Sequence, residues 1–161
     1  MATGTILLPL PGNPDNSNPP GLEWFNSKIR LLFDDSTDEI THITFRMPEN
    51  YASAPVLKAQ YSMASATSGN VIIACQVMAV TDGDSAAVDT DSYDTVNTSS
   101  ATAVPGTAGY IDEISLTLTN ADSLAAGDWI ALKFSRDANN ASDTATGDLE
   151  LIALSLEYTT S

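Results

Sequence analysis

Segments in which apolar and polar residues alternate recur along most of the chain. In a β-strand successive side chains point to opposite faces, so alternation with period two is typical of a strand with one buried face. Residues 56–63, 110–119 and 129–136 alternate most regularly, and Gly, Pro, Asn and Asp punctuate the intervening stretches. The pattern predicts an all-β protein. The eight expected strands cover residues 28–33, 39–47, 56–63, 71–80, 95–104, 110–119, 129–136 and 149–159.

The polar composition supports this prediction. Thr and Ser number 35 of the 161 residues, whereas Lys, Arg, Gln and Glu together number 14. The long polar residues are those that favour solvated helix faces, while Thr suits half-exposed strands and Ser suits turns. We therefore expect few helices, despite the abundance of Ala.

The spacing of the strands indicates the type of β fold. On average there is one strand for every roughly 17 residues of chain, loops included. This spacing suits long crossing loops better than a plain hairpin meander. We expect an antiparallel β-sandwich with Greek-key connections, specifically a jelly roll of about eight strands. A single immunoglobulin-like sandwich is the alternative, but such domains have shorter loops and about 100 residues.

The first 22 residues differ in composition from the rest. Five of the eight prolines lie between Pro9 and Pro20, and proline removes a backbone donor and favours extended conformations. We expect residues 1–22 to form an extended, Pro-rich N-terminal arm, followed by a sandwich domain over residues 23–161. The apolar tip of the arm, which contains Ile6, Leu7 and Leu8, needs a surface to dock on, either its own domain or a neighbouring molecule.

The chain is strongly acidic, with a formal net charge of −15 and a pI near 4.1. Such a charge repels nucleic-acid phosphates and anionic membrane surfaces. We therefore expect neither nucleic acid nor a membrane among the partners. No signal peptide and no apolar run of roughly 18 residues is present, so a soluble protein made in the cytosol is expected. The single cysteine, Cys75, lies in an apolar run and is expected to be buried.

No catalytic constellation stands out. His42 is the sole histidine, and no Gly-Xaa-Ser-Xaa-Gly elbow or phosphate-binding glycine loop occurs. Most carboxylates lie in loops, where they are solvated, whereas a catalytic acid needs partial desolvation. Trp24 and Trp129 are able to stack on sugars, but are equally normal as core or interface anchors. We expect a protein that is not an enzyme and needs no cofactor.

Calcium is the one candidate cofactor, because the loops are rich in carboxylates and hard cations prefer oxygen ligands. Asp82 and Asp84 form one candidate pair, and Asp137 and Asp143 form a second. Neither cluster has the spacing of an EF-hand loop. Asp is also common in turns, because its side chain bonds to its own backbone.

Four short stretches resemble the small jelly-roll structural proteins of tailed bacteriophages, which include capsid decoration (cement) proteins and related head or fibre appendage modules. The stretches are residues 43–48 with Tyr51, residues 65–71, residues 126–137 and residues 153–158. The resemblance implies a non-enzymatic component of the virion. It further implies a homotrimer bound to the major capsid protein or another virion protein, made in the host cytoplasm and located on the capsid surface.

Two functions follow from this resemblance. The first is a decoration protein that stabilises the phage head, with Ile6, Leu7, Leu8, Trp24 and Phe25 as interface residues, because aromatic side chains dominate interface hot spots. The second is a receptor- or glycan-binding head module of a tail fibre or spike, with loops 82–93 and 137–148 at the binding end. A free-standing bacterial carbohydrate-binding module is a third interpretation.

Overall fold

The computed structural model describes residues 2–85 and 87–161, and within them every regular element is a strand. All paired strands are antiparallel. The strands are β1 (Thr3–Leu7), β2 (Asn13–Pro14), β3 (Gly21–Phe25), β4 (Lys28–Phe33), β5 (Ile40–Arg46), β6 (Tyr51–Met63), β7 (Asn70–Val71), β8 (Ile73–Val80), β9 (Asn97–Thr98), β10 (Thr102–Ala103), β11 (Asp112–Thr117), β12 (Trp129–Arg136) and β13 (Leu149–Thr160).

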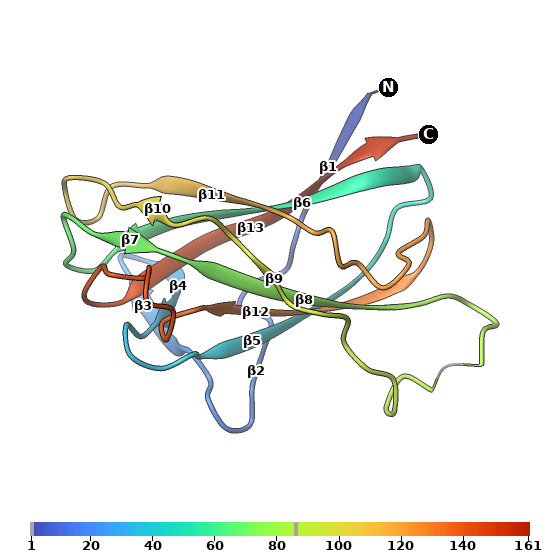
Figure 1. The fold of residues 1–161 in the computed structure, drawn as a ribbon, viewed down its shortest axis with the longest axis horizontal. Helices are drawn as coiled ribbons and strands as arrows, with labels where there is room; N and C mark the ends of the chain where they lie inside the picture. Colours follow the sequence, from blue (N-terminus) through green and yellow to red (C-terminus); the bar gives the residue numbers. More distant parts are fainter. Residues whose placement is uncertain (1, 86) are drawn as a thin grey trace.

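The strands form two main layers (Figure 1). The first, sheet A, has the order β11-β6-β13-β4-β3, with β1 also paired to β13. The second, sheet B, has the order β2-β5-β12-β8-β9, and β10 and β7 form a small separate ladder. The expected all-β jelly-roll sandwich is confirmed. No helix long and apolar enough to cross a membrane occurs in residues 2–85 and 87–161.

The core lies between the two sheets and follows the alternation of the sequence. On β6, Leu57, Ala59, Tyr61 and Met63 are all buried. On β12 the buried set is Ile130, Leu132 and Phe134, together with Ala131 and Arg136. The rings of Phe33 and Phe134 meet edge to face across the core at 5.4 Å between centroids. Cys75 is fully buried, as expected.

In strand β13, the structure differs from the expected orientation of one side chain. The alternation predicted that Ile152 shares a face with Leu154, Leu156 and Tyr158. The pairing of β13 with β6 shifts register between Leu151 and Ala153, which is a β-bulge. Because a bulge adds one residue, it changes the face that each following side chain occupies. Leu151 and Leu154 are consequently both buried, whereas Ile152 is half-exposed on the outer face of sheet A.

The N-terminal segment is extended, and it docks on its own domain. β1 pairs with β13, which places Thr3 opposite Thr159 and brings the two ends of the chain together (Figure 1). Leu8 donates its N–H to the carbonyl of Leu154 at 2.8 Å. β2 then pairs with β5 in the opposite sheet, so the Pro-rich segment crosses from sheet A to sheet B. Residues 2–22 therefore contribute strands to the sandwich.

Candidate ligand-binding site

Trp129 is the first residue of β12 and lies on the outer face of sheet B. Its position follows from alternation, because its neighbour Ile130 is fully buried in the core. The strand register places Trp129 between Arg46 of β5 and Val80 of β8. Its side chain remains half-exposed. An aromatic ring is thus held at the end of a rigid three-strand platform.

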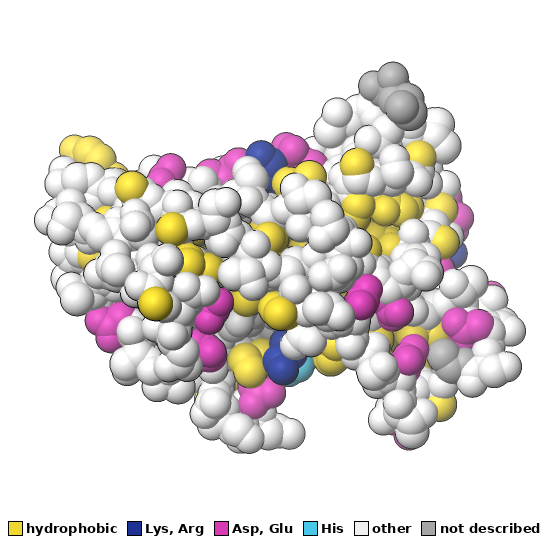
Figure 2. Space-filling view, in the orientation of Figure 1, with side chains coloured by type: hydrophobic (Ala, Val, Ile, Leu, Met, Phe, Trp, Pro, Cys, Tyr) yellow, Lys and Arg dark blue, Asp and Glu magenta, His cyan; other side chains and the backbone are white. Residues whose placement is uncertain are grey.

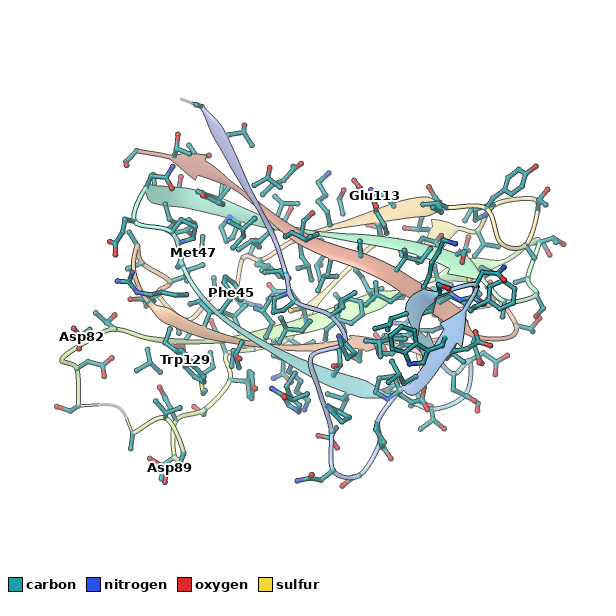
Figure 3. The ribbon with its side chains drawn as sticks, turned by 180° about the vertical axis from the view of Figure 1, so that it is seen from behind. Phe45, Met47, Asp82, Asp89, Glu113 and Trp129 are labelled. Carbon is teal, nitrogen blue, oxygen red and sulfur yellow. The ribbon has the colours of Figure 1, made fainter. Side chains whose placement is uncertain are left out.

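A pocket of about 390 Å³ opens beside this ring. Figure 3 shows that the loop carrying Asp82 and Asp89 lies on the same side of the molecule as Trp129. The pocket therefore combines an aromatic wall with carboxylate and guanidinium groups. Its lining residues are Arg46, Val80, Thr81, Asp82, Gly83, Asp84, Gly127 and Trp129.

The buried carboxylate of Asp128 fixes two walls of this pocket. Its Oδ1 accepts a hydrogen bond from the Thr81 hydroxyl at 2.9 Å, and its Oδ2 accepts one from the N–H of Ala125 at 2.7 Å. The carbonyl of Asp128 also accepts a bond from the N–H of Met47 at 2.8 Å. The segment that carries Asp82 is thereby tied to the turn before Trp129.

Gly127 allows the Arg46 side chain to lie close to the backbone where both residues line the pocket. Its φ is +83°, and a Cβ at this position would lie 3.1 Å from Nη2 of Arg46. The Arg46 guanidinium pairs with Glu49 at 2.6 Å, and both side chains are about two-thirds exposed. An exposed pair of this kind contributes little to stability. Because both side chains are exposed, a ligand can reach the donors and acceptors that the pair does not use.

The arrangement favours binding over catalysis. Asp82 and Asp84 are exposed, so water stabilises their charged forms, whereas a general acid needs partial desolvation. Asp84 is already engaged, because its Oδ2 accepts the N–H of Thr81 at 3.1 Å. Exposed carboxylates, a guanidinium and a half-exposed indole are suited to a ligand that has both hydroxyl groups and an apolar face.

The second expected calcium pair is taken up by protein contacts. Asp143 binds the buried guanidinium of Arg136 through both oxygens, at 2.7 and 3.1 Å, and also accepts the N–H of Ile72. Asp137 accepts a bond from the side-chain amide of Asn140 at 3.0 Å. Asp143 is therefore a structural anchor of loop 137–148, and calcium binding at Asp137 and Asp143 stays a prediction. Among the described residues, no three His, Cys, Asp or Glu side chains are grouped so that they could hold a metal ion. Calcium binding at Asp82 and Asp84 stays a prediction.

The five expected interface residues fall into two groups. Leu8 is buried in the core of its own domain, Ile6 is half-exposed and packs against that core, and Leu7 is 77% exposed. This corrects the assignment of Leu8, because the pairing of β1 with β13 carries it inside. Trp24 and Phe25, on β3, are 69% and 51% exposed. They do not contribute to the Trp129 pocket.

His42 has a structural role. Its Nε2 lies 3.2 Å from a carboxylate oxygen of Asp15, and its Nδ1 lies 3.0 Å from the hydroxyl of Tyr93. It thereby connects the N-terminal segment and segment 81–96 to β5. Figure 2 shows the surface indented between these two projecting segments, with the histidine beside the indentation.

Comparison with known proteins finds a solved structure with a similar fold. No family model matches the chain, and no curated protein matches it either. A solved structure, CBM35 from Cellvibrio japonicus Abf62, is similar over 98% of this chain and 99% of its own, with a TM-score of 0.52 and 10% sequence identity. At this identity the likeness establishes a shared β-sandwich architecture.

Proposed function

We propose that the chain is a non-catalytic binding module and that its ligand is a carbohydrate held in the Trp129 pocket. The observation that carries the proposal is the combination of a half-exposed indole with Arg46 and Asp82 in one pocket. The structural likeness to CBM35, a carbohydrate-binding module, supports it through the shared architecture.

The chemistry of the pocket matches that of a sugar ring. One face of a pyranose carries mainly C–H groups and packs against an aromatic ring, while its hydroxyls need donors and acceptors around the edge. Trp129 supplies the ring, Asp82 supplies acceptors and Arg46 supplies donors. A volume of about 390 Å³ lies in the usual range for a small-ligand pocket.

This function agrees with the glycan-binding alternative drawn from the sequence, in which a head module of a fibre or spike binds a receptor glycan. The proposed pocket differs from the binding end expected from the sequence. Segment 81–96 contributes to the pocket through Asp82, but loop 137–148 does not line it. The ligand is therefore held at the end of sheet B where β8 ends and β12 begins.

The experiment is glycan-array screening of the full chain, followed by calorimetry with a soluble oligosaccharide from the array. Trp129→Ala is expected to weaken binding by about 30-fold or more, because truncation of a central aromatic anchor costs about 2 kcal/mol. Trp24→Ala is the matched control and is expected to bind with unchanged affinity. Equal affinities for the wild type and Trp129→Ala would refute the assignment.

A second candidate function is the virion role, a decoration protein on the major capsid protein. The observation that favours it is the exposure of Trp24 and Phe25, two large aromatic residues of the type found at interface hot spots. It is tested by incubating the protein with assembled capsids and counting the bound copies. Hundreds of copies, lost on Phe25→Lys, are expected for a decoration protein, and absence of binding would exclude this role.

A further inference from the structure

β3 is an edge strand that lacks a partner on one side. It pairs with β4 in the order β13-β4-β3, and no described strand lies on its other side. The two strands are joined by Asn26 and Ser27, with φ of 48° and 63°. Two positive φ values in a two-residue loop define a type I′ hairpin. The hairpin therefore has a definite register, with Phe25 opposite Lys28.

This register determines which backbone groups of β3 point outward. The residues that flank a two-residue turn exchange hydrogen bonds, and bonded and non-bonded pairs then alternate along an antiparallel ladder. Phe25 and Glu23 are accordingly bonded to β4, while Trp24 and Leu22 lie opposite Ile29 and Leu31 in non-bonded positions. The N–H and C=O groups of Leu22 and Trp24 therefore face away from the sheet.

The side chains of the same two residues are also exposed. Leu22 is 55% and Trp24 is 69% exposed, and alternation puts both on one side of the strand. Edge strands are normally protected by charged side chains, proline or a bulge, because free ladder groups beside apolar side chains promote pairing. At Leu22 and Trp24 the edge carries apolar side chains instead.

The charges around this edge favour a second copy of the chain as the partner. The chain has a net charge of −15, and Figure 2 shows acidic side chains spread over the visible face. Around β3 and β4 the charges balance. Arg30 pairs with Glu23 at 2.8 Å and with Glu150 at 2.6 Å, and Lys28 is the neighbouring cation. Repulsion between two acidic copies is therefore reduced at this edge.

We propose that β3 pairs antiparallel with β3 of a second copy about a two-fold axis at Glu23. In this register Leu22 lies opposite the second copy's Trp24, and each such pair exchanges both of its N–H···O bonds. The exposed Leu22 and Trp24 side chains then pack against each other across the axis. The two Glu23 side chains face each other, and each is neutralised by the Arg30 of its own chain. The result is one continuous sheet across a self-complementary interface.

The first test is sedimentation of the full chain over a range of concentrations. The wild type is expected to reach twice the 16.9 kDa chain mass. Trp24→Lys is expected to remain a monomer, because it puts two charges at the contact. Leu7→Lys is the matched control, since Leu7 is 77% exposed on β1, and it is expected to dimerise like the wild type.

The second test uses the wild type and does not depend on a variant folding. In the dimer, the amide hydrogens of Leu22 and Trp24 become hydrogen-bonded, so their exchange with solvent is expected to slow as concentration rises. The amide of Glu23, already bonded to β4, is the internal reference. A monomer at all concentrations, exchange at Leu22 and Trp24 that is independent of concentration, or a trimer that persists in Trp24→Lys would overturn the proposal.

Discussion

The hydroxyl of Thr81 donates a 2.9 Å hydrogen bond to the carboxylate of Asp128, which is 2% exposed. This bond joins the end of β8 to the turn that precedes β12, and thus connects the two sides of the Trp129 pocket. A ligand site is effective when its walls are held in place before the ligand arrives. Thr81 and Asp128 are therefore positioning residues for the proposed sugar.

Thr81→Val tests this connection, because it keeps the shape of the side chain and removes the donor. The variant is expected to lose about 1–3 kcal/mol of unfolding free energy, since a buried acceptor loses its partner. Its affinity for the glycan is also expected to fall, because the Asp82 segment is released. Urea unfolding and calorimetry measure the two effects.

The control for this experiment is Thr90→Val in the same segment. Thr90 donates to the carbonyl of Ala87 at 3.2 Å in an exposed position, so its loss is expected to leave both stability and affinity unchanged. If Thr81→Val binds the glycan as the wild type does, the Thr81–Asp128 bond does not position the site.

The buried pair of Arg136 and Asp143 is expected to be the ion pair on which stability depends most. Their side chains are 0% and 1% exposed. Asp143→Ala leaves a buried guanidinium without its counter-charge and is expected to destabilise the fold by about 3–5 kcal/mol. Glu49→Ala removes the partner of Arg46 in an exposed pair and is expected to cost less than about 1 kcal/mol. Equal losses in urea unfolding would contradict this account of the core.

Acid lability is expected to depend on Asp15. The backbone N–H of Ser17, with further bonds from His42 and Asn18, lowers the pKa of Asp15 from the ordinary value of 3.8 to about 2. A carboxyl whose pKa is depressed by folding stabilises the protein above its unfolded pKa and loses that effect as pH falls through the folded pKa. Stability is therefore expected to fall between about pH 4 and pH 2.

The variant for this prediction is Asp15→Asn, which should show a flatter dependence of unfolding free energy on pH over the same window. Asp89→Asn removes an exposed carboxylate from segment 81–96 and serves as the control. Parallel pH curves for the wild type and Asp15→Asn would show that the Asp15 contacts do not matter for folding.

Cys75 is expected to be inert in the folded protein. Burial raises the pKa of its thiol to about 12, so the nucleophilic thiolate is absent at neutral pH and the sulfur is enclosed by the core. An aromatic disulfide reagent should react at the rate of unfolding. Rapid reaction under native conditions would mean that β8 opens locally.

The sequence allowed most of the fold to be predicted, because alternation is a local property. Residues 28–33 and 129–136 were expected as strands and are β4 and β12 with the same bounds. The pairing of β1 with β13 was not predictable in this way, since it joins Thr3 to Thr159 across the whole chain. The bulge at Ile152 was also missed, because residues 151–154 are all apolar, so no alternation in the sequence marks the change of face.

The candidate site was only partly visible in the sequence. Trp129 was recognised as able to stack on sugars, and its outward position can be read from the buried residues that alternate with it. Arg46 was missed, because it reaches Trp129 through a cross-strand register that the sequence does not state. Gly127 was missed as well, although a glycine directly before Asp128 and Trp129 is a signal for a tight turn at the strand end.

The central claim is tested most directly by the fluorescence of Trp129 itself. The chain has two tryptophans, so Trp24→Phe leaves Trp129 as the single reporter, and Trp129→Phe leaves Trp24. Titration with the array-selected oligosaccharide is expected to shift the emission of the Trp24→Phe protein in a saturable manner, with the dissociation constant found by calorimetry. The emission of the Trp129→Phe protein is expected to stay constant. A saturable change in the Trp129→Phe protein, with none in the Trp24→Phe protein, would place the ligand at β3 and contradict the account.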